Sequence, residues 1–238
     1  MELIQFLVYN TYIVNGDDIR KQVIGIPMGT NCAPLLANLY LYSYESAFID
    51  RLEASVSVAA ARSFHMSFRL IDDLLSVDNP LLHAYINVPA PESKEDGVGG
   101  IYPAQLTLNN TSLPDCVHFL GMELRYRGNS LELDIFDKKN EFPFQVIRYP
   151  HLDSVIPTSI PYGVFTGLLY RRYRICNRKP IFLDRSVELA TVLMNKRCSK
   201  RRLCRLFRKF LCQRAPLRWK CSVDSLLGQF SRRLGSCL

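Results

Sequence analysis

The sequence predicts an α+β domain followed by an all-helical, strongly basic region. Apolar runs in pairs flank turn residues up to about residue 136, and helical periodicity takes over from Pro161. The charge changes along the chain as well. Residues 1–170 carry 11 basic and 19 acidic side chains, whereas residues 171–238 carry 19 basic and 3 acidic. We therefore expect two domains, over residues 1–155 and 156–238.

Two hairpins and a helix are expected in the first part. Asn15-Gly16 is a hairpin turn dipeptide, so the alternating runs 12–14 and 20–24 predict paired strands. Residues 3–9 form an apolar run that fits a helix or a short strand. The range 34–52 repeats apolar residues at helical spacing after Pro34, which suits a first helical turn. Runs 64–70 and 74–77 flank Asp72-Asp73 and predict a hairpin with carboxylates at its tip.

The later elements follow from the same signals. Residues 81–88 predict a brief helix, and 89–100 contain the Pro, Ser and Gly of a surface loop. Runs 117–126 and 131–136 flank Gly128-Asn129 and predict a further hairpin. Helices are expected over 162–174, 183–196 and 200–214.

Composition excludes several classes of protein. A chain of 238 residues with 48% hydrophobic residues is neither disordered, collagenous nor a disulfide-stapled miniprotein. Eight cysteines without a CxxC pair favour reduced structural thiols over a zinc ribbon, and so an intracellular protein of the nucleus or cytoplasm. The uncharged stretch 23–44 contains glycines and prolines, so we expect no membrane helix there and no membrane partner.

Two clusters suggest chemistry. Adjacent Asp72 and Asp73 repel each other unless a cation lies near them, and a hard divalent ion is the natural partner. An ordinary Asp-rich turn is the alternative. The second cluster is the loop Gly25–Asn31, whose glycines flank Pro27 and let another molecule approach closely before a helix begins. A plain strand-to-helix turn is its alternative.

The basic segment indicates a polyanionic partner, with nucleic acid as the first candidate. A solvated helical face or a disordered basic tail are the alternatives. Apolar residues interleave the charges, which favours helices with one packed face and one basic face. The residues expected to contact phosphates are Arg201, Arg202, Arg205 and Arg208.

Together the two clusters resemble a known family. The chain reads GIPMGTNCAPLLANLYLYSYE over residues 25–45 and FRLIDD over residues 68–73. These runs resemble motifs B and C of reverse transcriptases, and their residues are most similar to those of the Penelope-like retroelement branch. Phe119-Leu120-Gly121 looks like the primer-grip hairpin, and the stretches 137–144 and 161–165 are similar to segments that follow the palm in this branch.

The resemblance implies a right-hand polymerase palm followed by a helical, thumb-like region. Asp72 and Asp73 would then hold catalytic Mg²⁺ or Mn²⁺. Gly25, Pro27, Met28, Gly29 and Asn31 would lie against the templating base pair and the incoming dNTP. Phe119, Leu120 and Gly121 would hold the primer 3′ end, and the basic helices would grip an RNA template paired with a DNA primer. The expected palm is a sheet with the Asp72 hairpin at its centre and the Gly25–Asn31 loop on the same side.

The chain also departs from the family. Leu70 stands where most members carry Tyr or Phe, and 89–100 resembles an insertion. No motif A aspartate and no fingers region are recognisable before Gly25, and no GIY-YIG-type nuclease pattern is present. The expected function is therefore that of a palm-and-thumb piece of a longer RNA-directed DNA polymerase, inactive without its N-terminal part. The alternative is a degenerate or domesticated fragment that only binds nucleic acid.

Overall fold

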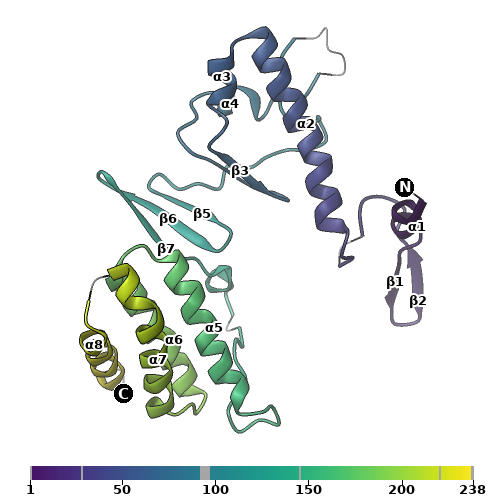
Figure 1. Cartoon of the computed structure of the whole chain (residues 1–238). Coiled ribbons are helices and arrows are strands. Elements are labelled where there is room, and N and C mark those ends of the chain that lie inside the picture. Colours follow the sequence, from purple (N-terminus) through teal and green to yellow (C-terminus); the bar gives the residue numbers. More distant parts are fainter. Residues whose placement is uncertain (1, 28, 92–96, 145, 220, 237–238) are drawn as a thin grey trace. The chain divides into compact units, whose positions relative to one another are not determined.

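The computed structural model describes residues 2–27, 29–91, 97–144, 146–219 and 221–236. It confirms the α+β class, with helices and small antiparallel sheets (Figure 1). The chain divides into two compact units, Met1–Asn110 and Thr111–Leu238. In the described part of the chain, no helix is both long and apolar enough to cross a membrane.

The first unit contains helices and two separate hairpins. Its elements are α1 (Glu2–Tyr9), β1 (Tyr12–Asn15), β2 (Asp18–Lys21), α2 (Ala33–Ser55), α3 (Val58–Arg62), β3 (Ser67–Leu70), β4 (Asp73–Ser76) and α4 (Leu82–Tyr85). The Asn15-Gly16 hairpin is confirmed, but its second strand begins at Asp18, before the predicted range. The two-residue turn pairs Asn15 with Asp18, and so it fixes the register.

The core of the first unit forms between α2, α3 and the segment around residue 101. Phe48 and Leu52 of α2 are fully buried, and Phe48 packs edge-on against both Phe64 and Tyr85. The Ser57 side chain caps α3 by accepting from the Ala60 amide at 3.1 Å. The core therefore lies along the C-terminal half of α2.

The hairpin β3–β4 is a two-stranded sheet by itself. The expectation that it would be the central hairpin of a larger sheet is therefore wrong for the described residues. A two-stranded hairpin is marginally stable alone, so its support comes from side chains of α2.

The second unit combines a three-stranded sheet with a helical bundle. Its elements are β5 (Cys116–Phe119), β6 (Met122–Arg127), β7 (Ser130–Ile135), the short 3₁₀ helix Lys138–Glu141, α5 (Ser159–Ile175), α6 (Lys179–Asn195), α7 (Lys200–Trp219) and α8 (Val223–Ser236). The hairpin around Gly128-Asn129 is confirmed as β6–β7. The predicted run 117–126 is instead two strands, because the chain turns at Leu120-Gly121.

Aromatic side chains fill the helical bundle. Phe207 of α7 stacks on Phe230 of α8 with ring centroids 4.0 Å apart, and Phe182 of α6 stacks on Phe207 at 6.1 Å. The helix α8 is an addition to the three helices that the sequence predicts, although Leu226, Phe230 and Leu234 repeat at four-residue spacing and are all buried.

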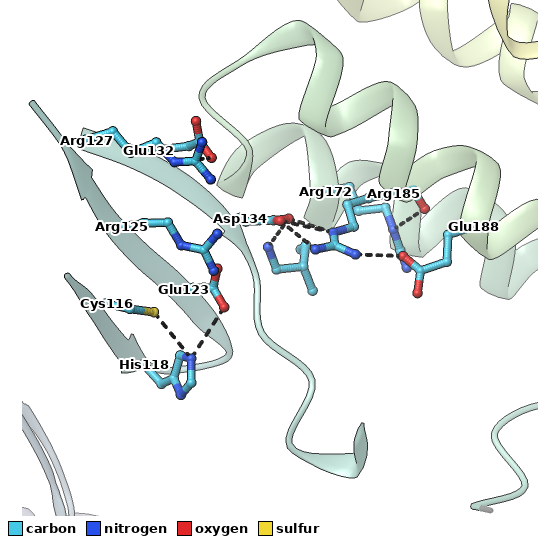
Figure 2. Close-up of polar contacts among 11 residues, drawn as sticks. Cys116, His118, Glu123, Arg125, Arg127, Glu132, Asp134, Arg172, Arg185 and Glu188 are labelled. Carbon is cyan, nitrogen blue, oxygen red and sulfur yellow. Dashed lines mark hydrogen bonds and ion pairs between the residues drawn. The ribbon is translucent and has the colours of Figure 1, made fainter. Parts of the chain in front are cut away.

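The sheet docks on the helices through β7. Arg185 of α6 binds the Asp134 carboxylate with contacts of 2.6–3.1 Å (Figure 2). The Asn177 amide donates to the Leu131 carbonyl at 2.7 Å and accepts from the Leu133 N–H at 2.9 Å. These contacts place the sheet with the helices, so the compact units divide near residue 110, whereas the sequence predicts a boundary near residue 155.

Candidate functional site

Asp72 and Asp73 lie at the tip of the β3–β4 hairpin, as the sequence predicts. Leu70 pairs with Asp73, so Ile71 and Asp72 form a two-residue turn. Both carboxylates are exposed, and neither forms an ion pair with any described residue. The two negative charges are therefore available to a cation from solvent.

The turn adopts an unusual backbone conformation at Ile71. Its φ is +53°, in the left-handed region that β-branched residues rarely occupy. The Ile71 amide donates to Asn38 Oδ1 of α2 at 3.0 Å. A strained residue persists only where its surroundings impose it, and this hydrogen bond supplies part of that constraint.

Arg69 connects the hairpin to α2. Its guanidinium binds both carboxylate oxygens of Glu45, and it donates to Asn38 Oδ1 at 2.7 Å and to the Asn38 carbonyl at 3.1 Å. The Arg69 side chain is only 10% exposed. Glu45 also accepts from the Tyr102 hydroxyl at 2.7 Å. We call Asn38, Glu45, Arg69 and Tyr102 the hairpin clamp.

The ionisation states in the hairpin clamp are mutually supporting. The hydrogen bond to Glu45 raises the pKa of Arg69, so the guanidinium stays charged. Burial and the hydrogen bond to Glu45 raise the pKa of Tyr102, so its hydroxyl stays a donor at neutral pH. The clamp therefore keeps its hydrogen bonds at physiological pH.

The two faces of the hairpin differ. Arg69 and Leu74 form a register pair facing α2, where they line a cavity of about 220 Å³ together with Glu45 and Tyr102. Neither Asp72 nor Asp73 lines this cavity. Leu70, paired with Asp73, is 45% exposed on the other face. The carboxylates consequently face solvent at the tip.

The Gly25–Asn31 loop leads directly into α2. Gly25 and Gly29 have φ of +86° and +94°, which accounts for glycine at both positions. Pro27 is buried, Asn31 is exposed, and Thr30 donates to the Pro27 carbonyl at 3.0 Å. Predicted site residue Met28 lies outside the described residues.

One helix connects the loop to the hairpin. α2 starts at Ala33, and Asn38 follows five residues later, which is about 7.5 Å along a helix. No hydrogen bond or ion pair joins the described loop residues to Asp72 or Asp73. The two predicted motifs thus share α2 as their support, without touching each other through polar contacts.

The predicted primer-grip residues form the turn between β5 and β6. Phe119 is buried at the end of β5, and Leu120 and Gly121 have φ of +50° and +73°. A Cβ on Gly121 would lie 2.3 Å from the Arg171 guanidinium of α5, and the Gly121 carbonyl accepts from the Phe136 amide at 3.1 Å. The turn is therefore fixed against the helices of the second unit.

The four predicted phosphate-binding arginines differ in their surroundings. All are exposed on α7, opposite the buried Leu203 and Phe207. Arg202 stacks over the Tyr162 ring at 4.0 Å, and Arg208 lies 3.7 Å from an Asp224 oxygen. Arg201 and Arg205 have no hydrogen bond or ion pair among the described residues. These two are the cations most available to an anionic ligand.

The chain was compared with protein-family models, with curated proteins and with solved structures, and none of the three comparisons finds a match.

The carboxylates of the tip suit one hard cation. Two aspartate side chains can bind Mg²⁺ while the ion keeps several waters. Among the described residues, no further Asp, Glu, His or Cys side chain lies close enough to Asp72 and Asp73 to form a three-ligand metal site with them. The described residues therefore offer ligands for one ion but do not surround two, as a bridged two-metal site requires.

The residues of the hairpin clamp are not among the site residues predicted from the sequence. Asn38 and Glu45 lie in the run 25–45, and Arg69 lies in the run 68–73, so all three belong to the quoted motifs. A charged Arg between apolar residues of a short strand was the available signal, because a buried guanidinium needs a carboxylate partner.

Replacing Asn38 tests whether the clamp holds the turn. Asn38→Leu leaves the half-buried Ile71 N–H and one Arg69 N–H without an acceptor, so we expect a loss of about 1–3 kcal/mol in unfolding free energy. Amide exchange at Ile71 should accelerate by a matching factor. Asn38→Asp keeps the acceptor oxygen and is the matched control. Equal Ile71 exchange in the wild type and both variants, measured by NMR, would show that the clamp does not hold the turn.

Proposed function

We propose that this chain is the palm-and-thumb part of an RNA-directed DNA polymerase. In this proposal, Asp72 and Asp73 hold Mg²⁺ for nucleotidyl transfer. The observation that carries it is the exposed carboxylate pair, without an ion pair among the described residues, on a strained turn that half-buried side chains of α2 keep in place. An ordinary Asp-rich turn needs neither a left-handed Ile nor a buried arginine behind it.

The cation has a clear physical role in this proposal. Mg²⁺ bound at the tip would neutralise the phosphates of an incoming dNTP and orient the reacting oxygens. Asp72 and Asp73 would contribute ligand oxygens, and the hairpin clamp would keep both at a fixed position relative to α2. Because phosphoryl transfer depends mainly on positioning and charge neutralisation, rigid support of the ligands matters directly.

The Gly25–Asn31 loop fits a substrate-facing role. It precedes the helix that carries Asn38 and Glu45, so any ligand seated on the loop would be positioned by the same helix as the carboxylates. A Cβ added at Gly29 would meet no other atom within 4 Å, so another molecule could approach the Gly29 backbone closely.

The exposed face of α2 is consistent with a larger palm. Leu35, Leu39 and Tyr42 lie on one face of the helix and are 62%, 54% and 61% exposed. Further strands of a palm, including one that supplies a third carboxylate, would cover this face and the open edges of β3–β4.

The basic surface of α7 supports a second candidate function, that of a nucleic-acid-binding fragment without catalysis. Arg201 and Arg205 are four residues apart on one exposed helical face, a spacing that suits adjacent phosphates. This candidate is favoured by the absence of a third metal ligand beside Asp72 and Asp73 in the described ranges.

Manganese binding tests the metal role without requiring catalysis. Mn²⁺ added to the protein should broaden the NMR signals of the Ile71–Leu74 amides, because paramagnetic relaxation acts only near the ion. Excess Mg²⁺ should reverse the broadening, and Asp72→Asn should remove it. Asp78→Asn changes another exposed aspartate just after β4 and is the control. If the hairpin signals stay sharp in the wild type, the carboxylates do not hold the metal.

Primer extension tests catalysis directly. The described residues supply ligands for one metal ion only, and a two-metal mechanism needs ligands for two. The 238-residue chain should therefore bind primer–template but incorporate labelled dNTP only at the background rate with Mg²⁺ or Mn²⁺. A longer polypeptide that adds a strand ending in Asp should extend the primer on an RNA template, and Asp72→Asn should then abolish extension.

The opposite result is equally informative. Robust extension by the 238-residue chain, lost in Asp72→Asn, would place a further carboxylate such as Asp17 or Asp18 at the site. Failure of the longer polypeptide to extend any primer would instead favour the binding-only function.

The salt dependence of binding tests the α7 surface. Each lost phosphate contact reduces the slope of log K against log[salt] by about 0.9, so Arg201→Gln with Arg205→Gln should flatten it by about 2. Arg20→Gln with Lys21→Gln removes the same charge from the exposed strand β2 and should leave the slope nearly unchanged. Fluorescence anisotropy on an RNA–DNA hybrid measures both. Equal flattening by the two pairs would mean that only net charge matters.

A further inference from the structure

A second group of metal-ligand side chains lies in the other unit, on the β5–β6 hairpin. Cys116 and His118 are two residues apart on β5 and therefore point to the same face of the sheet. Glu123 of β6 is the register partner of His118. Figure 2 shows the three side chains converging beside β5 and β6.

The distances between these side chains match those of a tetrahedral zinc site. Cys116 Sγ is 3.6 Å from His118 Nε2, and the same Nε2 is 3.4 Å from Glu123 Oε2. With Zn–S of about 2.3 Å and Zn–N or Zn–O of about 2.0–2.1 Å, tetrahedral angles separate S from N by about 3.6 Å and N from O by about 3.4 Å. The three ligand atoms all lie within 4.8 Å of one another.

The neighbouring residues hold two of the ligands in place. The Phe136 ring stacks on the His118 imidazole with centroids 3.6 Å apart, which fixes the plane of the ring. Arg125 donates to Glu123 Oε1 at 2.5 Å, so the carboxylate directs its other oxygen at His118. The Glu123 side chain is 19% exposed and the His118 side chain 31%, so the cluster is half-buried but open to an ion from solvent.

The charges also leave room for a cation. With Cys116 as thiolate and Glu123 ionised, the ligands carry two negative charges, of which Arg125 offsets one. A divalent ion therefore meets a net negative group. Because the Arg125 guanidinium repels a metal cation, this site should bind the ion more weakly than an all-cysteine site without a basic neighbour.

We propose that Cys116 Sγ, His118 Nε2 and the Glu123 carboxylate bind one Zn²⁺ ion, with its fourth position open to solvent. A thiolate, an imidazole and a carboxylate together suit Zn²⁺, whereas Mg²⁺ and Ca²⁺ take oxygen ligands. On binding, the Cys116 thiol releases its proton to solvent and a Zn–S bond forms. No electron transfer is involved.

The ion would crosslink β5 and β6 next to the Leu120-Gly121 turn. The ligands lie on both sides of this turn, at positions 116, 118 and 123, so a bound ion closes it into a short loop. Stabilisation then grows with free Zn²⁺ concentration, since only the folded hairpin presents the three ligands together. This site differs in ligand chemistry from the aspartate pair, and its existence does not depend on the polymerase proposal.

Cobalt substitution tests the site in the full chain. Metal-free protein titrated with Co²⁺ should gain visible d–d bands of four-coordinate cobalt and a near-ultraviolet thiolate-to-cobalt band, both saturating at one equivalent. Zn²⁺ should displace the cobalt. Cys116→Ser and His118→Gln should weaken Co²⁺ binding by more than the roughly 100-fold that loss of a supporting hydrogen bond can cost.

Two matched controls separate this cluster from other ligands. Cys212→Ser removes an exposed cysteine of α7 and should leave both bands intact. His151→Gln removes a histidine that lies 3.6 Å from an Asp153 oxygen in an exposed pair and should also have no effect.

A measurement on the wild type guards against unfolded variants. Cadmium-113 NMR of the Cd²⁺-loaded protein should give one signal in the range of a single sulfur ligand with nitrogen and oxygen. The absence of thiolate bands in the wild type, bands that survive Cys116→Ser, or a cadmium signal typical of oxygen ligands alone would each overturn the proposal.

Discussion

The geometry of the β3–β4 hairpin tip depends on the hydrogen bonds that the buried guanidinium of Arg69 makes to α2. A two-stranded hairpin has little stability of its own, and β3–β4 is joined to α2 by the Arg69 side chain and the Ile71 amide. The Arg69 side chain is only 10% exposed, so its charge must be paired. Without the Glu45 carboxylate, the free energy of burying this charge would exceed the small folding free energy of a two-stranded hairpin. Position and conformation of the turn are thereby coupled to one helix.

This coupling explains why Ile71 can occupy a left-handed conformation. Asn38 accepts from both Arg69 and the Ile71 amide, so the same oxygen that satisfies the charge also fixes the strained residue. A left-handed β-branched residue costs roughly 1–2 kcal/mol, which charge-assisted hydrogen bonds of this kind can offset. The strained residue and the hydrogen bonds that hold it therefore lie together, next to the exposed Asp72 and Asp73.

The elements that sequence predicted correctly are those with local signals. Asn15-Gly16 and Gly128-Asn129 specify turns within four residues, and both hairpins form around them. The run 117–126 looked like one strand because a leucine with positive φ is not a local turn signal, and only the family resemblance indicated a hairpin at Phe119-Leu120-Gly121. The close approach of Gly121 to Arg171 is a long-range contact that local patterns do not reveal. Within the candidate site, the Asp72-Asp73 pair could be read directly. Its supports could not, because Arg69 and Glu45 are 24 residues apart and nothing local relates them.

The division into units shows a similar limit. The change in charge marks where basic helices begin, but compactness depends on which side chains join the elements, and Asp134 with Arg185 joins the sheet to those helices. Asn177 adds a different kind of junction. Its amide group supplies one donor and one acceptor to the backbone of β7, as a neighbouring strand would do. The backbone groups at the outer edge of β7 around Leu131 and Leu133 are thus already hydrogen-bonded, and a new strand could not pair with them there. We therefore expect a strand added by another segment or another molecule to join along β5, because the β7 edge at Leu131 and Leu133 already hydrogen-bonds Asn177.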